Sequence, residues 1–113
     1  MSRYDQGRRL EWAARDALTA AGYLVLRSAG SKTPVDLAAF RPAPNVACPP
    51  DLVFVQCKTD GYLLPADRQK FARLADELGF EPLVADWYKE GRAARMVRFR
   101  KVYKDGLTET WRI

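Results

Sequence analysis

The sequence contains no histidine, and this absence excludes a large group of catalytic mechanisms. Hydrolases built on Ser/His/Asp or Cys/His arrangements, histidine-dependent RNA cleavage and most zinc enzymes all need an imidazole. A hydrolase made from this chain must therefore work with carboxylates and lysine, and we expect it to use a hard metal ion.

Cysteine is scarce as well: Cys48 and Cys57 have neither a CxxC spacing nor histidine partners. We therefore expect no disulfide and no zinc site, and we interpret Cys57 as a small buried hydrophobe within an apolar strand. No apolar run approaches the roughly 18 residues that a membrane-spanning helix needs. The first residues lack the long apolar region of a secretory signal, so we expect a cytoplasmic protein with no membrane partner.

The positive charge is unevenly distributed along the 113 residues. Residues 1–88 carry 11 basic and 11 acidic groups, whereas residues 89–113 carry 8 basic and 3 acidic groups, so the whole net charge of +5 falls in the last quarter. A concentrated basic segment is typical of proteins that bind a polyanion, although basic residues also solvate exposed strand faces.

Hydrophobic periodicity predicts one α/β domain spanning residues 1–113, with one sheet and two helices. A helix is expected over 6–21 and another over 65–79, each followed by glycine near its end. Strands are expected at 23–28, 35–40, 52–58, 81–88 and 94–102, with a turn at 104–106 leading to a short final strand that ends at Ile113. The strand at 52–58 is the most apolar segment, which predicts a central position in the sheet.

Four polar residues stand out against this layout: Glu11 in the first helix, Asp36 at the start of a strand, and Gln56 and Lys58 on the central strand. Side chains alternate along a strand, so Gln56 and Lys58 are expected to point the same way. A metal-dependent phosphodiesterase needs oxygen ligands for Mg²⁺ and a cation near the reacting phosphate. These four residue types supply both.

The segments "GRRLEWAARDAL", "PVDLAAF" and "VFVQCK" occur in an order that resembles the PD-(D/E)xK nucleases, and within them the archaeal-type Holliday junction resolvases. Asp36 stands at the family's PD position, and Gln56 and Lys58 stand at its (D/E)xK. The stretch "RSAGS" resembles the serine-containing active-site loop, with Arg27 and Ser31 at corresponding positions. The resemblance covers about residues 7–85. It implies a restriction-endonuclease-like fold, with a mixed central sheet flanked by helices, and a homodimer that cuts four-way DNA junctions.

The resemblance also implies roles for individual residues. The Mg²⁺ ligands would be Glu11, Asp36, the Gln56 side chain and the Cys57 backbone carbonyl, with Mn²⁺ as an alternative ion. Lys58 would orient the attacking water or stabilise the pentavalent phosphate, and Ser31 would contact the scissile phosphate. Basic residues expected to contact DNA phosphates are Arg8, Arg9, Arg27, Lys32, Arg95, Arg98 and Arg100.

Each residue also has a structural interpretation. Glu11 could pair with Arg15 one helical turn away, Asp36 could cap a turn, and Lys58 could extend to solvent. Gln56 is harder to explain, because burying an amide without partners costs on the order of 1–3 kcal/mol. Glutamine also departs from the family's acidic residue and brings no charge to a metal. Two alternatives therefore stay open: another nuclease of the superfamily, for repair, restriction or phage DNA processing, and a non-catalytic DNA-binding relative.

Overall fold

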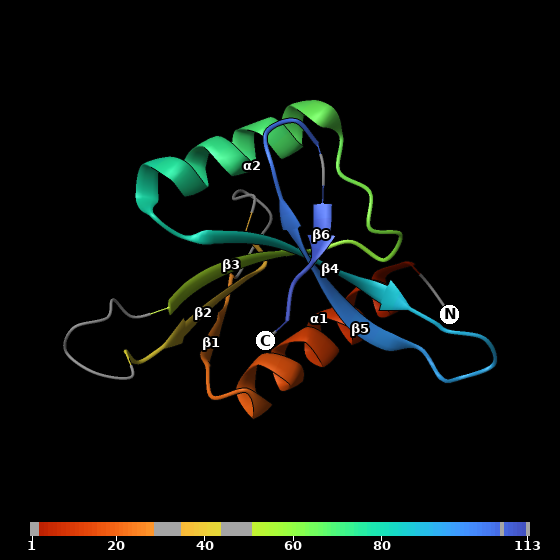
Figure 1. Ribbon diagram of the computed structural model, residues 1–113. Coiled ribbons are helices and arrows are strands. Elements are labelled where there is room, and N and C mark those ends of the chain that lie inside the picture. The colour runs from red at the N-terminus through yellow and green to blue at the C-terminus, as the bar shows by residue number, and fades with distance from the viewer. Residues whose placement is uncertain (1–2, 29–34, 44–50, 107, 113) are drawn as a thin grey trace.

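The computed structural model describes residues 3–28, 35–43, 51–106 and 108–112, and within them every predicted helix and strand is present (Figure 1). In chain order the elements are α1 (Arg3–Ala20), β1 (Leu24–Arg27), β2 (Leu37–Arg41), β3 (Asp51–Cys57), α2 (Pro65–Leu78), β4 (Glu81–Tyr88), β5 (Met96–Val102) and β6 (Thr108–Thr110). The prediction for the last strand was wrong at its end: β6 stops at Thr110, and the Trp111 N–H then donates to the Phe99 carbonyl.

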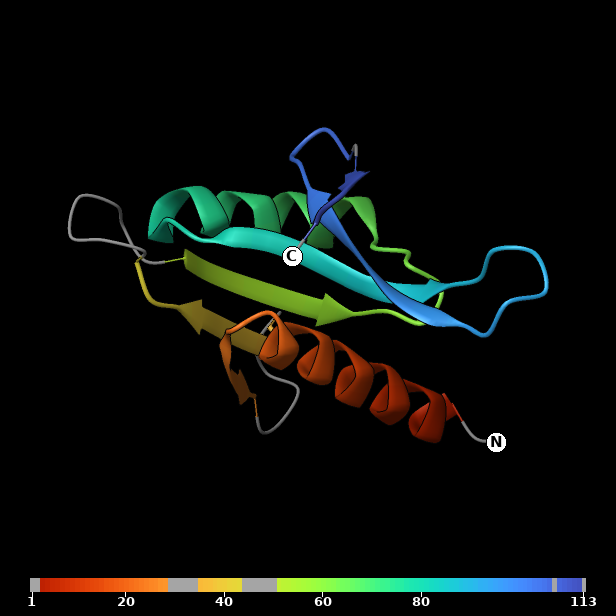
Figure 2. The ribbon, with the colours of Figure 1, turned by 60° about the horizontal axis from the view of Figure 1, so that its bottom comes forward.

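The six strands form one sheet in the order β1-β2-β3-β4-β5-β6. All neighbouring pairs are antiparallel except β3 and β4, which run parallel because α2 connects them as a crossover. The helices lie on opposite faces of this sheet (Figure 2). The protein is therefore an α/β fold with a mixed central sheet flanked by helices, and β3 is an interior strand, as predicted.

Helix α1 packs on one face of the sheet through a stripe of small and apolar residues at helical spacing. Leu10, Ala14 and Leu18 are fully buried and belong to one core cluster with Val55 and Leu83 of the two central strands. The helix contacts strands β1 to β5, so it spans most of the sheet.

Helix α2 packs on the opposite face and is defined at both ends by its sequence. Pro65 occupies its first turn, and Gly79 closes it in a left-handed conformation with φ 77°, donating its N–H to the Ala75 carbonyl. Phe71 is fully buried and lies 5.8 Å, centroid to centroid, from the ring of Phe80. This second core fixes how the chain returns from β3 to β4.

The sheet face on the α2 side is only partly covered. Within the described residues, α2 contacts β4 and β5 but neither β1 nor β2. Val25 packs toward α1, so its neighbours Leu24 and Leu26 point to the other face, where Leu24 pairs with Phe40. Leu24 is 66% exposed and Leu26 is 53% exposed. The edge strand β1 therefore presents an apolar surface.

No helix among the described residues is long and apolar enough to cross a membrane.

Candidate functional site

Asp36 immediately precedes β2 and is bound to β3 by both its backbone and its side chain. Its N–H donates to the Val55 carbonyl at 2.9 Å, and its carboxylate Oδ2 accepts from the Cys57 N–H at 2.7 Å. The antiparallel register that pairs Leu37 with Val55 places Asp36 at the carboxyl end of β3. Asp36 therefore does more than cap a turn, because it joins the start of one strand to the end of the next.

The electrostatics around Asp36 show which charged groups lie near it. Burial raises the pKa of its carboxyl most, the hydrogen bond from the Cys57 N–H lowers it, and the nearby negative charge of Glu11 raises it further. Lys58 and Arg27 act in the opposite direction with smaller effects. The net pKa is raised, so a second negative charge beside Glu11 is costly in this position.

Glu11 reaches the site from α1 and forms an ion pair with Arg27 of β1. The Glu11 side chain is 17% exposed, whereas that of Arg27 is 52% exposed. The alternative pairing of Glu11 with Arg15 is not formed, since Arg15 pairs with its neighbour Asp16 at 3.5 Å. Glu11 is thus a half-buried carboxylate directed across the sheet edge toward the Asp36 region, not a residue of the outer helix face.

Gln56 is buried, with 6% of its surface exposed. It shares the α2 side of β3 with Leu52 and Phe54 and pairs in register with Val84 of β4. Glu11 approaches from the α1 side of the same sheet. The structure therefore places Glu11 and Lys58 each within electrostatic range of Asp36, whereas Gln56 is buried on the α2 side of β3, the side to which Lys58 also belongs by alternation.

Cys57 and Lys58 complete the end of β3. Cys57 packs toward the α1 core, and burial, followed by the charges of Asp36 and Glu11, strongly raises the pKa of its thiol. Mg²⁺ is a hard ion that prefers oxygen ligands, so the suitable donor of Cys57 is its backbone carbonyl. The Lys58 N–H donates to the Ala85 carbonyl at 2.9 Å, so the backbone of Lys58 continues the ladder to β4.

The donor set suits a hard cation better than a soft one. Among the described residues, no three His, Cys, Asp or Glu side chains form a cluster that could hold a metal ion. Two carboxylates, those of Glu11 and Asp36, nevertheless lie within electrostatic range, and burial, together with the charge of Glu11, raises the pKa of Asp36. Carboxylate, amide and carbonyl oxygens fit Mg²⁺, which binds proteins through one or two carboxylates and retains water ligands.

The basic residues expected to contact DNA differ in their surroundings. Arg9 is exposed, Arg8 lies over the Trp12 ring at 4.8 Å and Arg95 lies over the Trp87 ring at 5.1 Å. Arg98 and Arg100 instead bind Asp86. Ser31 and Lys32 lie outside the described residues. The basic last quarter of the chain is therefore partly neutralised by acidic partners from earlier strands.

Asp86 is the polar residue that the sequence pattern did not single out. It is 2% exposed in the middle of β4, and its carboxylate accepts hydrogen bonds from Arg98 Nε at 3.0 Å and Arg98 Nη2 at 2.8 Å. Arg100 Nη2 lies 3.2 Å from the same carboxylate. The signal that could have identified it was a charged residue inside the apolar run "PLVADW". A polar residue inside an apolar strand identified Gln56 in the same way.

The fold resembles that of a known nuclease. Of solved structures, the Holliday junction resolvase Hjc from the archaeal hyperthermophile Archaeoglobus fulgidus matches with a TM-score of 0.55 and 26% sequence identity, covering 83% of this chain and 70% of that chain. No protein-family model and no curated protein sequence matches the chain. The structural likeness is consistent with the nuclease superfamily that the sequence motifs resemble.

Proposed function

We propose that this protein is a metal-dependent endonuclease that hydrolyses phosphodiester bonds in branched DNA. The observation that carries the proposal is the attachment of the Asp36 carboxylate to the Cys57 backbone beside Glu11 and Lys58, in a fold similar to that of a Holliday junction resolvase. Two carboxylates and a lysine near the carboxyl end of β3 are the groups that metal-dependent phosphodiester hydrolysis can use when histidine is absent.

Asp36, Glu11, the Gln56 side chain and the Cys57 backbone carbonyl would hold Mg²⁺, with Mn²⁺ as the alternative. The bound ion would supply Lewis-acid stabilisation of the phosphate oxygens. Lys58 would orient the attacking water or stabilise the charge that develops as the P–O bond to the leaving group breaks. Ser31 would contact the scissile phosphate.

The direct test incubates the purified protein with a labelled four-way junction, or with a linear duplex of the same sequence, in Mg²⁺ or EDTA. Wild type should cut the junction in Mg²⁺ only, and Asp36→Asn should reduce the rate by at least about a hundredfold. Asp51→Asn is the matched control, since Asp51 begins β3 at its other end and forms an exposed pair with Arg41. Equal products from wild type and Asp36→Asn would disprove the catalytic assignment.

Two alternatives follow from specific features. A nuclease for other branched or linear DNA would show its preference in the same assay when flap and nicked substrates are added. A non-catalytic DNA binder is favoured by Gln56, because an amide brings no negative charge to the metal. Calorimetric titration with Mg²⁺ separates the two, since a non-catalytic relative would bind the ion only after Gln56→Glu.

We also infer that the protein acts as a homodimer, as the resemblance implies. The exposed apolar surface of Leu24, Leu26 and Phe40 supports this, because contiguous exposed apolar side chains mark interaction sites. Sedimentation velocity should detect a dimer that Leu26→Lys weakens. Leu64→Lys, at an exposed leucine before α2, should leave the dimer intact if β1 forms the interface.

A further inference from the structure

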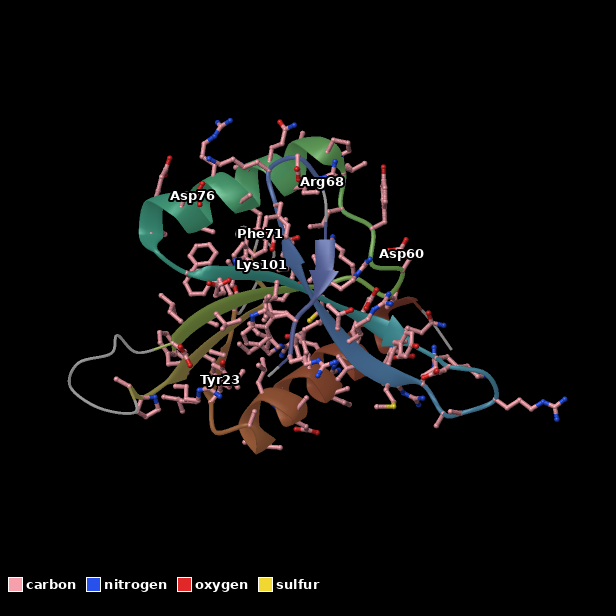
Figure 3. The ribbon with its side chains drawn as sticks, in the orientation of Figure 1. Tyr23, Asp60, Arg68, Phe71, Asp76 and Lys101 are labelled. Atoms are coloured by element: carbon pink, nitrogen blue, oxygen red, sulfur yellow. The ribbon has the colours of Figure 1, made fainter. Side chains whose placement is uncertain are left out.

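A small cavity lies on the α2 side of the sheet, close to the turn that follows β3. Its volume is about 170 Å³, and its walls are the loop of residues 61–63, Arg68 of α2, Arg100 of β5 and Gly106 in the turn after β5. Figure 3 shows Arg68 near the start of α2, facing the turn between β5 and β6. Two guanidinium groups from different elements therefore line one space.

Arg100 is fixed in this wall by two contacts. Its Nη2 donates to the Gly61 carbonyl at 2.9 Å and lies 3.2 Å from the Asp86 carboxylate. Asp86 also accepts two hydrogen bonds from Arg98, so one carboxylate serves two guanidinium groups. Among the printed contacts of these described side chains, two guanidinium groups therefore share one carboxylate.

Arg68 adds a second cation without adding an anion. Its Nη1 approaches the Leu63 carbonyl at 3.4 Å, a long contact, and its buried Nε has no hydrogen-bond partner. No carboxylate of the described residues forms an ion pair with Arg68. A buried charged donor without an acceptor is costly, so an oxyanion here would satisfy it.

Two glycines give the guanidinium groups the room they need. A Cβ on Gly61 would clash with Asp86 Oδ2 and Arg100 Nη2, and one on Gly106 would clash with Arg68 Nη2. Both glycines have positive φ, 71° and 90°, which other residues rarely adopt. The cavity is thus bounded by positions where any side chain would displace an arginine.

The cavity is connected to the candidate catalytic site through one turn. The Gly61 N–H donates to the Lys58 carbonyl at 2.9 Å, so the residue that supplies the proposed catalytic amine begins the turn that Arg100 anchors. A nucleic acid strand passing Lys58 would present further phosphates along its length. Guanidinium groups match phosphate oxygens in a planar, bidentate geometry.

We propose that the cavity between Arg68 and Arg100 binds a backbone phosphate of the DNA, next to the one at the candidate catalytic site. The proposal rests on the proposed function for its DNA ligand. Asp86 would orient Arg100 toward the phosphate, and Arg68 would contact the same phosphate from the opposite wall of the cavity. The same two guanidinium groups could also bind free inorganic phosphate, and the experiment below distinguishes that ligand from a DNA phosphate.

The test measures fluorescence anisotropy of a fluorescein-labelled four-way junction, in EDTA and over a range of KCl concentrations. Arg68→Gln should weaken binding about tenfold and reduce the slope of log K against log salt by about one, the value for one phosphate contact. Arg73→Gln is the matched control, since Arg73 is an exposed arginine on the same helix. It should stay within about twofold of wild type. Arg68→Lys, which keeps the charge without the planar fork, should give an intermediate loss.

Equal affinities and salt slopes for Arg68→Gln and Arg73→Gln would overturn the proposal. If Arg68→Gln does not fold, Arg68→Lys decides by the same comparison. Thermal melts in inorganic phosphate form the second arm: phosphate that stabilises wild type but not Arg68→Gln, with DNA affinity unchanged, would overturn the assignment to DNA. A wild type that cuts no DNA, while Arg68→Gln still loses affinity, would refute the nuclease function and support this site.

Discussion

Asp86 and Arg98 lie directly opposite each other on β4 and β5, and Arg98 binds both carboxylate oxygens of Asp86 through two hydrogen bonds. The Asp86 side chain is 3% exposed, whereas the Arg98 side chain is 30% exposed. The hydrogen bond to Asp86 raises the pKa of Arg98, so the guanidinium remains charged. A bidentate pair of this kind stabilises the sheet and also favours one register between β4 and β5. Shifting β5 by one residue would turn Arg98 away from its partner.

Removing the carboxylate should therefore destabilise the protein strongly. Asp86→Ala would leave Arg98 and Arg100 beside each other without their shared anion, in a partly buried position. We expect the free energy of unfolding to fall by about 2–4 kcal/mol, a little below the usual cost of breaking a buried pair, because the arginines keep some access to water. Urea denaturation followed by circular dichroism measures the change.

The control for that prediction is Asp76→Ala, which removes an ion pair of the same chemistry on the surface. Asp76 and Lys104 are 2.7 Å apart, but their side chains are 65% and 61% exposed. Exposed pairs contribute less than about 1 kcal/mol. Similar losses for Asp86→Ala and Asp76→Ala would show that burial does not strengthen the Asp86 cluster.

Two glycines with nearly the same backbone conformation provide a second comparison. Gly61 has φ 71° and would crowd Asp86 and Arg100 if it carried a Cβ, whereas Gly79 has φ 77° and open space around it. Gly79→Ala should cost about 1 kcal/mol, the backbone cost alone. Gly61→Ala should cost about 1–3 kcal/mol more, because side chains must also move. Equal melting temperatures for the two variants would show that the contacts at Gly61 relax freely.

The elements could be predicted because their signals are local. The stripe of Leu10, Ala14 and Leu18 defines α1, and β3 is an interior strand, as its apolar content predicted. The order of these elements also sufficed to suggest the fold class.

The charge partners could not be predicted, because they depend on register between strands. Arg98 and Arg100 looked like free phosphate contacts in a basic segment, yet the pairing of β5 with β4 gives both of them Asp86. The alternative partner that sequence spacing offered Glu11 was Arg15, but packing of α1 on the sheet gives it Arg27 instead. Sequence spacing predicts neighbours within one element and not across two.

Gln56→Glu tests the one position that departs from the family pattern. A carboxylate at a site only 6% exposed is costly without a counter-ion, so we expect the variant in EDTA at neutral pH to be about 1–3 kcal/mol less stable than wild type. If a metal binds here, Mg²⁺ should raise the melting temperature of the variant more than that of wild type. Gln69→Glu, on the exposed side of α2, is the control and should respond to neither change. A Mg²⁺ response equal to that of wild type would place residue 56 outside the metal site.

Asp36→Asn should stabilise the metal-free protein at neutral pH. Burial and the charge of Glu11 raise the pKa of Asp36 above its ordinary value of 3.8, so the native state holds this proton more tightly than the unfolded state does. Stability contributed by Asp36 is therefore largest at low pH and is lost as the pH rises from that ordinary value through the raised one. Asparagine removes the charge at every pH, and its side-chain oxygen can still accept the hydrogen bond from the Cys57 N–H.

Thermal melts in EDTA should therefore show Asp36→Asn above wild type at pH 7, with the difference disappearing as the pH falls below about 4, the ordinary pKa of an aspartate. Added Mg²⁺ should reverse the order, because only wild type offers the ion a carboxylate at this position. Asp51→Asn, which loses an exposed pair with Arg41, should gain no stability under either condition. A lower melting temperature for Asp36→Asn at pH 7 in EDTA would mean that the Asp36 carboxylate stabilises the fold, and that the repulsion from Glu11 is already compensated within the protein.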